Sequence, residues 1–242
     1  MNDPQKVDAI TTRALGFVLP PRCLLCGDLG ADGRDLCAGC VADLALNSPC
    51  CPRCALPLQV PAPMCGECLK RPPPFAAAWV PFCYGHPLDL LEARFKFRGD
   101  LAAGRVLADL MLERARFDAP TPPAMLIPVP LHRTRLRERG YNQALELARP
   151  LARAMAIPLQ HDVLERTKAT PPQTGLDAKA RRRNLRDAFS VAAGAQLPAH
   201  VALFDDVMTT GATLRECARV LKQAGVQRVD VWALARAADR LK

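Results

Sequence analysis

The sequence predicts an α/β protein in which helices flank a parallel β-sheet, preceded by a small cysteine-rich domain. Residues 201–204 are four apolar residues in a row, which is typical of a strand buried on both faces of a parallel sheet. A helical period of apolar residues follows and ends at Gly225, since glycine commonly stops a helix. Four Cys-x2-Cys pairs occupy residues 23–68. Large apolar residues are few there, so this part of the chain needs another source of stability.

The cysteine pairs form the strongest single pattern in the chain. Ten residues separate each pair from the next, and two such pairs complete a tetrahedral shell of four sulfur ligands. We therefore predict structural zinc. A disulfide framework is less favoured because no secretory signal precedes the cysteines, and an iron–sulfur cluster stays an alternative. The predicted ligands are Cys23, Cys26, Cys37, Cys40, Cys51, Cys54, Cys65 and Cys68.

Spacing alone leaves the grouping of these ligands open. A sequential grouping puts the first four cysteines on one ion and the last four on another, but an interleaved grouping also satisfies the spacing. Cys50 competes with its neighbour Cys51, although Cys51 has the two-residue gap to Cys54. Cys217, which lies in a predicted helix, is interpreted as a packed core thiol.

Length and composition fit one domain of ordinary size and a smaller one. The chain has 242 residues, of which 50% are hydrophobic, so global disorder is excluded. No run of 18 apolar residues occurs, and we expect a cytoplasmic protein without a membrane span. The predicted division is a lead segment at 1–22, a double zinc ribbon at 23–70 and an α/β domain at 75–242. The prolines at 72–74 form a stiff boundary.

Periodicity and helix breakers place the other elements. We predict strands at 75–84, 124–130, 161–164 and 226–234, and helices at 88–98, 101–117 and 142–155. A polar stretch at 165–188 is too long for an ordinary connection inside a compact domain. It is interpreted as a mobile functional loop, with a short helix at 177–185 as an option.

The positive charge of the chain is unevenly distributed. The formal net charge is +9, and residues 130–190 contain 13 Arg and Lys against six Asp and Glu. This excess predicts a polyanionic partner, either a diphosphate or a nucleic-acid backbone. Four alternating arginines at 133, 135, 137 and 139 follow the carboxyl end of a predicted strand, where open α/β sheets bind ligands. We therefore favour anion contacts over a merely solvated face.

Residues 205–213 combine carboxylates with a hydroxyl-rich turn that opens a helix. The backbone N–H groups and helix dipole at such a turn attract phosphate, and glycine lets the backbone approach it closely. The spacing fits neither the nucleotide-triphosphatase loop nor the dinucleotide fingerprint. An acidic strand end followed by an ordinary helix cap is the alternative without a ligand. The candidate residues are Asp205, Asp206, Thr209, Thr210, Gly211, Ala212 and Thr213. Their order resembles the phosphoribosyl-diphosphate (PRPP) motif of the type I phosphoribosyltransferases.

The assembled pattern resembles the ComF family from Cys23 almost to the end of the chain. The resemblance rests on the cysteine pairs, the Pro-Val-Pro-Leu segment at 128–131, residues 135–143, residues 166–184 and the acidic pair with its turn. Tyr141 stands where the family often has Phe. The resemblance implies a type I phosphoribosyltransferase core, with a Rossmann-like parallel sheet, behind a zinc ribbon. It also implies a role linked to DNA uptake or DNA utilisation.

This resemblance leads to a hypothesis for the site. Residues 209–213 would hold the 5-phosphate of PRPP, and Asp205 with Asp206 would bind the ribose hydroxyls. Mg²⁺ would bridge ribose and diphosphate oxygens. Arg139, Arg166 and Lys168 would neutralise the departing diphosphate.

The rival hypothesis is a non-catalytic protein of the competence machinery in which the zinc ribbon and the arginine face bind single-stranded DNA. A DNA-binding regulator gated by PRPP would combine both hypotheses. Aromatic residues for base stacking are scarce, at 5% of the chain, which disfavours the rival. The sequence does not indicate an acceptor substrate or an oligomeric state.

Overall fold

The structure, a computed structural model, describes residues 20–118, 120–168 and 187–237. Its contacts divide the chain into two compact units, one of residues 1–44 with 86–106 and the other of residues 45–85 with 107–242. Each unit is described by itself below. The sequence boundaries at 1–22, 23–70 and 75–242 stay a prediction. No helix in the described part of the chain has the length and apolar character needed to cross a membrane.

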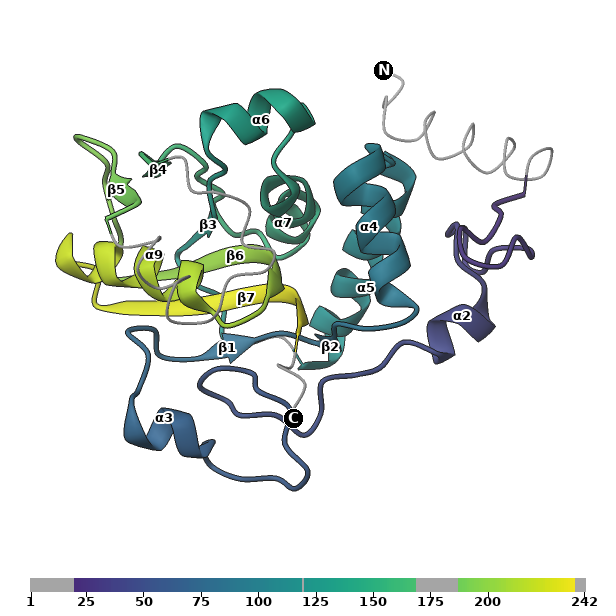
Figure 1. Cartoon of the computed structure of the whole chain (residues 1–242), viewed down its shortest axis with the longest axis horizontal. Helices are drawn as coiled ribbons and strands as arrows, with labels where there is room; N and C mark the ends of the chain where they lie inside the picture. Colours follow the sequence, from purple (N-terminus) through teal and green to yellow (C-terminus); the bar gives the residue numbers. More distant parts are fainter. Residues whose placement is uncertain (1–19, 119, 169–186, 238–242) are drawn as a thin grey trace, which may run out of the picture. The chain divides into compact units, whose positions relative to one another are not determined.

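The second unit is built on a five-stranded parallel sheet (Figure 1). Its order is β1-β7-β6-β3, with β2 also pairing with β7, and every pairing is parallel. The predicted α/β class is therefore confirmed. The strands are β1 (Ala78–Trp79), β2 (Phe82–Cys83), β3 (Met125–Pro128), β6 (His200–Met208) and β7 (Arg228–Arg236).

The core of this unit lies along β6 and β7. Residues 201–204 of β6 and 231–235 of β7 are fully buried, as strands covered on both faces must be. The two strands pair in register from His200↔Arg228 to Met208↔Arg236. Trp232 of β7 meets Trp79 of β1 edge to face, with ring centroids 5.4 Å apart.

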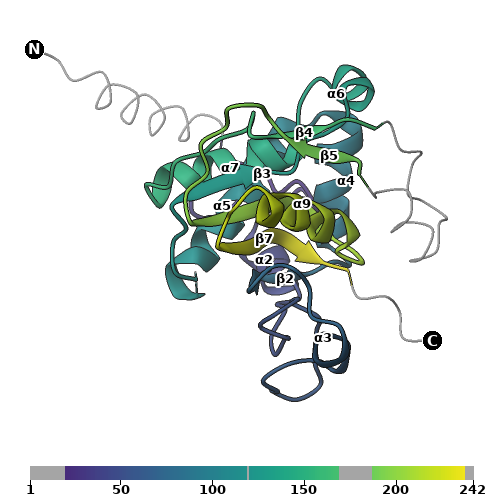
Figure 2. The same ribbon diagram turned by 90° about the vertical axis from the view of Figure 1, so that its left-hand side faces the viewer.

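Two amphipathic helices cover this sheet. Helix α9 (Ala212–Gln223) buries an apolar face that includes Leu214 and Leu221, and it lies along β6 and β7 in both views (Figures 1 and 2). Helix α7 (Gln143–Ala154) packs against β3 and β6. Asn142 caps α7, and its Nδ2 also donates to the Val129 carbonyl at 3.0 Å. The predicted helix at 142–155 is thereby confirmed.

Three predictions about elements of this unit need correction. The strand expected at 161–164 begins at Leu164, as β4 (Leu164–Arg166), and pairs antiparallel with β5 (Phe189–Val191), which was not predicted. The basic segment after β3 contains a helix, α6 (Arg133–Arg139), capped by His132 and ended by Gly140. The strand expected at 75–84 is split into β1 and β2.

Each of these errors has a physical cause. The strands are only two or three residues long, which is too short for a period of two to show. Helix α6 has no buried residue, so no apolar stripe marks it. Most of the polar stretch predicted as a loop, residues 169–186 with the optional helix at 177–185, lies outside the described residues.

The first unit contains α2 (Ala38–Ala42), α4 (Leu88–Arg98) and the start of α5 (Leu101–Asp118), which continues into the second unit. The predicted helices at 88–98 and 101–117 are confirmed. Arg94 of α4 pairs with Asp100 at 2.8 Å, and its Nη1 donates to the Leu24 carbonyl at 2.6 Å. Arg94 thus links α4 to the first cysteine pair.

A close contact between α4 and α5 predicts the effect of one substitution. A Cβ at Gly104 would lie 2.6 Å from the Phe95 ring, which is buried, so the ring would have to move. We expect Gly104→Ala to lower the free energy of unfolding by about 1–2 kcal/mol, because overpacking outweighs the better helix propensity of alanine. Denaturant unfolding measures this. Gly85→Ala, where a Cβ meets nothing within 4 Å, is the control. Equal stability of the two variants would refute the predicted clash.

Candidate functional site

The acidic pair lies inside strand β6, three residues from its carboxyl end, rather than beyond the strand. Asp205 Oδ1 accepts from the Asp206 N–H at 3.0 Å, and Asp206 Oδ1 accepts from the Val207 N–H at 2.8 Å. Both residues are half-buried. Because consecutive strand residues point to opposite faces of a sheet, the two carboxylates leave β6 on different sides.

The turn between β6 and α9 is short and tightly packed. It consists of residues 209–211, and Gly211, in the left-handed region with φ +70°, is the N-cap of α9. The positive φ favours glycine at 211, and a Cβ there, 2.7 Å from Met208 Cε, would also displace the end of the Met208 side chain. Thr210 Oγ1 accepts from the Ala212 N–H at 3.4 Å. The turn therefore presents a helix N-terminus directly after the acidic strand end.

Arg166 lies within electrostatic range of both Arg135 and Asp205. Burial lowers the pKa of Arg166, the positive charge of Arg135 lowers it further, and Cys217 and the carboxylate of Asp205 oppose both effects. Arg166 belongs to β4 and stacks over the Phe189 ring of β5 at 5.4 Å. The hairpin thus brings a half-buried guanidinium to the face of β6 that carries Asp205. Sequence reasoning placed Arg135 among the alternating arginines but did not single it out.

The other two predicted diphosphate ligands have different surroundings. Arg139 Nη1 donates to Gln143 Oε1 at 2.6 Å, joining the end of α6 to the start of α7. Lys168 is exposed, just after β4. The role of both residues at the site stays a prediction.

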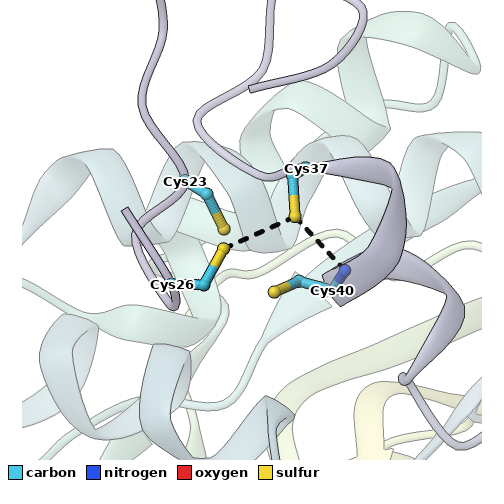
Figure 3. Close-up of side chains that lie close together, drawn as sticks. All are labelled: Cys23, Cys26, Cys37 and Cys40. Carbon is cyan, nitrogen blue, oxygen red and sulfur yellow. Dashed lines mark hydrogen bonds between the residues drawn. The ribbon is translucent and has the colours of Figure 1, made fainter. Parts of the chain in front are cut away.

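The eight predicted cysteine ligands form two clusters. In each cluster the four sulfur atoms lie within 4.8 Å of one another, and the grouping is sequential. Figure 3 shows the sulfurs of the first cluster converging, with Cys26 Sγ 3.6 Å from Cys37 Sγ. The two sets are Cys23, Cys26, Cys37 and Cys40 in the first unit, and Cys51, Cys54, Cys65 and Cys68 in the second.

Both clusters are built on the same plan. The first pair of each forms a tight turn, in which the N–H after the second cysteine donates to the carbonyl of the first: Gly27 to Cys23 and Ala55 to Cys51. Gly27 and Ala55 both have positive φ. The second pair of each cluster opens a five-residue helix, α2 or α3 (Gly66–Lys70). The two clusters therefore share the same local structure at corresponding cysteines.

The two clusters differ in burial. All four cysteines of the second cluster are buried, whereas Cys26 of the first is exposed. Cys50 lies outside the second cluster, which settles its competition with Cys51 in favour of Cys51.

The electrostatics of the clusters suit a cation. Burial alone would raise the pKa of Cys51, but backbone N–H groups directed at its sulfur lower it to about 7. Cys23 shows the same opposition, and its pKa falls to about 6. Burial raises the pKa of Cys54 to about 11. Each cluster thus contains one cysteine with a lowered pKa beside cysteines whose pKa is raised. A central Zn²⁺ would allow all four thiols to ionise.

Comparisons with known proteins agree with this architecture. The Double zinc ribbon domain family matches residues 14–69. Competence protein F of Haemophilus influenzae is 41% identical over 223 residues, which are 89% of this chain and 97% of that protein. DNA utilization protein YhgH of Salmonella typhimurium is 34% identical over 228 residues, which are 91% of this chain and 99% of that protein.

One solved structure is also similar, at a low level. Glutamine phosphoribosylpyrophosphate amidotransferase of B. subtilis, complexed with ADP and GMP, matches 54% of this chain and 26% of its own. The identity is 19% and the TM-score 0.37, which is too low to carry an argument.

The relatives and the fold together identify the family to which the chain belongs. The similarity to competence protein F and YhgH spans the cysteine clusters and the parallel sheet alike. The predicted architecture, a parallel α/β sheet with flanking helices and an N-terminal double zinc ribbon, is confirmed. The chain belongs to the ComF family, that of competence protein F and the DNA utilization protein YhgH.

Proposed function

We propose that this protein binds PRPP with Mg²⁺ at the carboxyl end of β6 and transfers its phosphoribosyl group to an acceptor. The observation that carries the proposal is that the acidic pair is followed, after a short turn, by a helix N-terminus. Asp205 and Asp206 end within three residues of the turn at 209–211, which opens α9. Carboxylates suit ribose hydroxyls, and the helix N-terminus suits a phosphate.

The 5-phosphate would lie against residues 209–213. Backbone N–H groups of the turn and of the first turn of α9, the helix dipole and the threonine hydroxyls would supply donors to phosphate oxygens. Gly211 allows the close approach of the backbone that such contacts need.

The acidic pair would hold the ribose. Asp205 and Asp206 accept hydrogen bonds from sugar hydroxyls, and their negative charge favours the positive charge that develops at the anomeric carbon. Since the two side chains leave β6 on opposite faces, we expect unequal contributions, with Asp205 on the side of Arg166. Carboxylate oxygens also suit Mg²⁺, which when bound would neutralise part of the diphosphate charge.

The departing diphosphate needs positive charge. Arg166, which interacts electrostatically with Asp205, would provide it together with its neighbour Arg135, and Arg139 and Lys168 are the further candidates from the sequence. In the transfer, the bond between the anomeric carbon and the diphosphate oxygen breaks, and its electron pair leaves with diphosphate. The acceptor forms the new bond to the same carbon. Arginines fixed beside that oxygen stabilise the charge that it gains.

The cysteine clusters would each hold one structural Zn²⁺. Four thiols within 4.8 Å match a tetrahedral sulfur shell. Thiols stay available for zinc in a reducing compartment, which is why we place the protein in the cytoplasm. The names of the relatives, competence protein and DNA utilization protein, support a role linked to DNA uptake or utilisation.

The basic surface of α6 supports a second candidate function, binding of single-stranded DNA. Arg133 and Arg137 are one turn apart on α6 and both are exposed. An exposed pair of this kind contacts a phosphate backbone without regard to sequence. In this alternative the turn at 209–211 would be retained as a scaffold or sensor.

The PRPP site is tested by calorimetric titration of PRPP and Mg²⁺ into the zinc-loaded protein. We expect micromolar affinity, and Asp205→Asn with Asp206→Asn should weaken it about a hundredfold, because a hydrogen bond to a charged group contributes about 1.5–3 kcal/mol. The exposed Asp162→Asn is the control for a lost charge. Equal affinity of the double variant and the wild type would refute the assignment of the acidic pair.

The zinc sites are tested by metal content per chain. We expect two zinc ions in the wild type, two in Cys50→Ser and one in Cys51→Ser, because Cys51 belongs to the second cluster and Cys50 does not. Native mass spectrometry counts the ions directly. Loss of an ion from Cys50→Ser, or a single ion in the wild type, would contradict the two-cluster arrangement.

The DNA alternative is tested by the salt dependence of single-stranded DNA binding. If α6 grips DNA, Arg133→Ala with Arg137→Ala should reduce the slope of log K against log salt by about 1.4, as expected for two lost phosphate contacts. PRPP affinity should not change. The exposed arginines Arg98 and Arg105, replaced in the same way, are the control. A slope unchanged by the α6 substitutions would exclude α6 as the DNA contact.

A further inference from the structure

The last residue of β7, Arg236, is a buried cation beside the proposed phosphate turn. Only 7% of the residue is exposed. Its strand partner in the sheet is Met208, the last residue of β6. A buried guanidinium is costly unless its N–H groups are satisfied, so the identity of its acceptors indicates what holds it in place.

Three of these acceptors lie at the end of the two central strands. Nη1 of Arg236 donates to the Met208 carbonyl at 3.0 Å and to the Thr209 carbonyl, and it lies 2.5 Å from the Ala237 carbonyl. Met208 and Thr209 are the residues with which the chain leaves β6 for the turn. The Met208 carbonyl also accepts from the Ala237 N–H at 3.0 Å, whereas the Thr209 carbonyl is held by Arg236. Arg236 therefore acts mainly on the second peptide group of the turn, between Thr209 and Thr210.

That direction decides where the donors of the turn point. A peptide group is planar and trans, so its carbonyl and its N–H point in opposite directions. Since the carbonyls of Met208 and Thr209 point toward Arg236, the N–H groups of Thr209 and Thr210 point away from it. Released carbonyls could instead turn toward a bound phosphate and repel it. Arg236 thus influences which way the N–H groups of the turn point, although Arg236 itself lies outside the turn.

The fourth acceptor belongs to the second cysteine cluster. Nε of Arg236 donates to the Cys54 carbonyl at 3.2 Å. Cys54 is buried, and the turn that holds its carbonyl is closed by the Ala55 N–H, which donates to the Cys51 carbonyl at 2.7 Å. Two ligands of the cluster therefore form the turn that orients Arg236.

We infer that Arg236 is a positioning residue that couples metal binding at the second cysteine cluster to the shape of the phosphate turn. The inference rests on the proposed function. Metal bound by Cys51 and Cys54 holds the Cys54 carbonyl, that carbonyl orients Arg236, and Arg236 orients the turn. The first cluster lies in the other compact unit, so it serves as an internal comparison.

The coupling is tested at the amide of Gly211 by nuclear magnetic resonance. Labelling threonine with carbonyl ¹³C and glycine with ¹⁵N selects Gly175 and Gly211, the two glycines that follow a threonine, and a Thr174→Ser background removes the first. In the zinc-loaded protein, Arg236→Met should shift or broaden the Gly211 signal. Arg228→Met, at the other end of β7, should leave it unchanged.

A second pair of variants tests whether the loss of metal from the second cluster disturbs the turn. Cys68→Ser and Cys40→Ser each remove the fourth ligand of one cluster, and neither residue contacts Arg236 among the described hydrogen bonds. We expect each to lose one zinc ion, but only Cys68→Ser should disturb Gly211. If Arg236→Met fails to fold, Arg236→Lys, which keeps the charge and loses the forked geometry, replaces it.

PRPP affinity, measured on the same proteins, separates this inference from the proposed function. We expect dissociation constants raised about tenfold or more in Arg236→Met and Cys68→Ser, as for a lost buried hydrogen-bond network. A wild type that binds no PRPP, with Gly211 still disturbed in those two variants, would refute the proposed function and support the coupling. A Gly211 signal in Arg236→Met identical to that of the wild type would overturn the coupling, as would equal effects of Cys40→Ser and Cys68→Ser.

Discussion

The parallel pairing of β6 with β7 is the interaction on which the rest of the second unit depends. Both strands are buried on both faces over their central residues, and their register runs to Met208↔Arg236. This register brings two chemically different features to one edge of the sheet. The acidic pair and the helix-opening turn come from β6, and the buried arginine comes from β7. A slip of one residue would turn every side chain of a strand to the opposite face.

The second cysteine cluster is continuous with this sheet in the second unit. The Ala78 N–H of β1 donates to the Pro52 carbonyl at 3.0 Å, and Asn47 Nδ2 donates to the carbonyls of Ala55 and Val80 at 2.9 and 3.0 Å. The cysteine turn thus supplies acceptors to the strands and to Arg236. A metal that folds this segment therefore also shapes the sheet edge at which ligands of open α/β proteins bind.

The sequence was sufficient where a pattern was long or chemically specific. Residues 201–204 predicted the central strand, and the constant cysteine spacing predicted zinc ligation by eight cysteines, with one or two ions. Only the structure shows two clusters and which cysteines group together. The sequence failed for β5 and α6, which are too short or too polar to show a period. The sequence did not single out Arg135 among the alternating arginines and did not indicate Arg236 at all, because their surroundings depend on neighbours distant in sequence, Arg166 and Cys54.

The most direct test is a crystal structure of the zinc-loaded protein with PRPP and Mg²⁺. We expect the 5-phosphate against the backbone N–H groups of residues 209–213, the ribose beside Asp205 and the diphosphate toward Arg166. PRPP bound elsewhere would contradict the proposed site. A turn at 209–211 left empty by saturating PRPP would do the same.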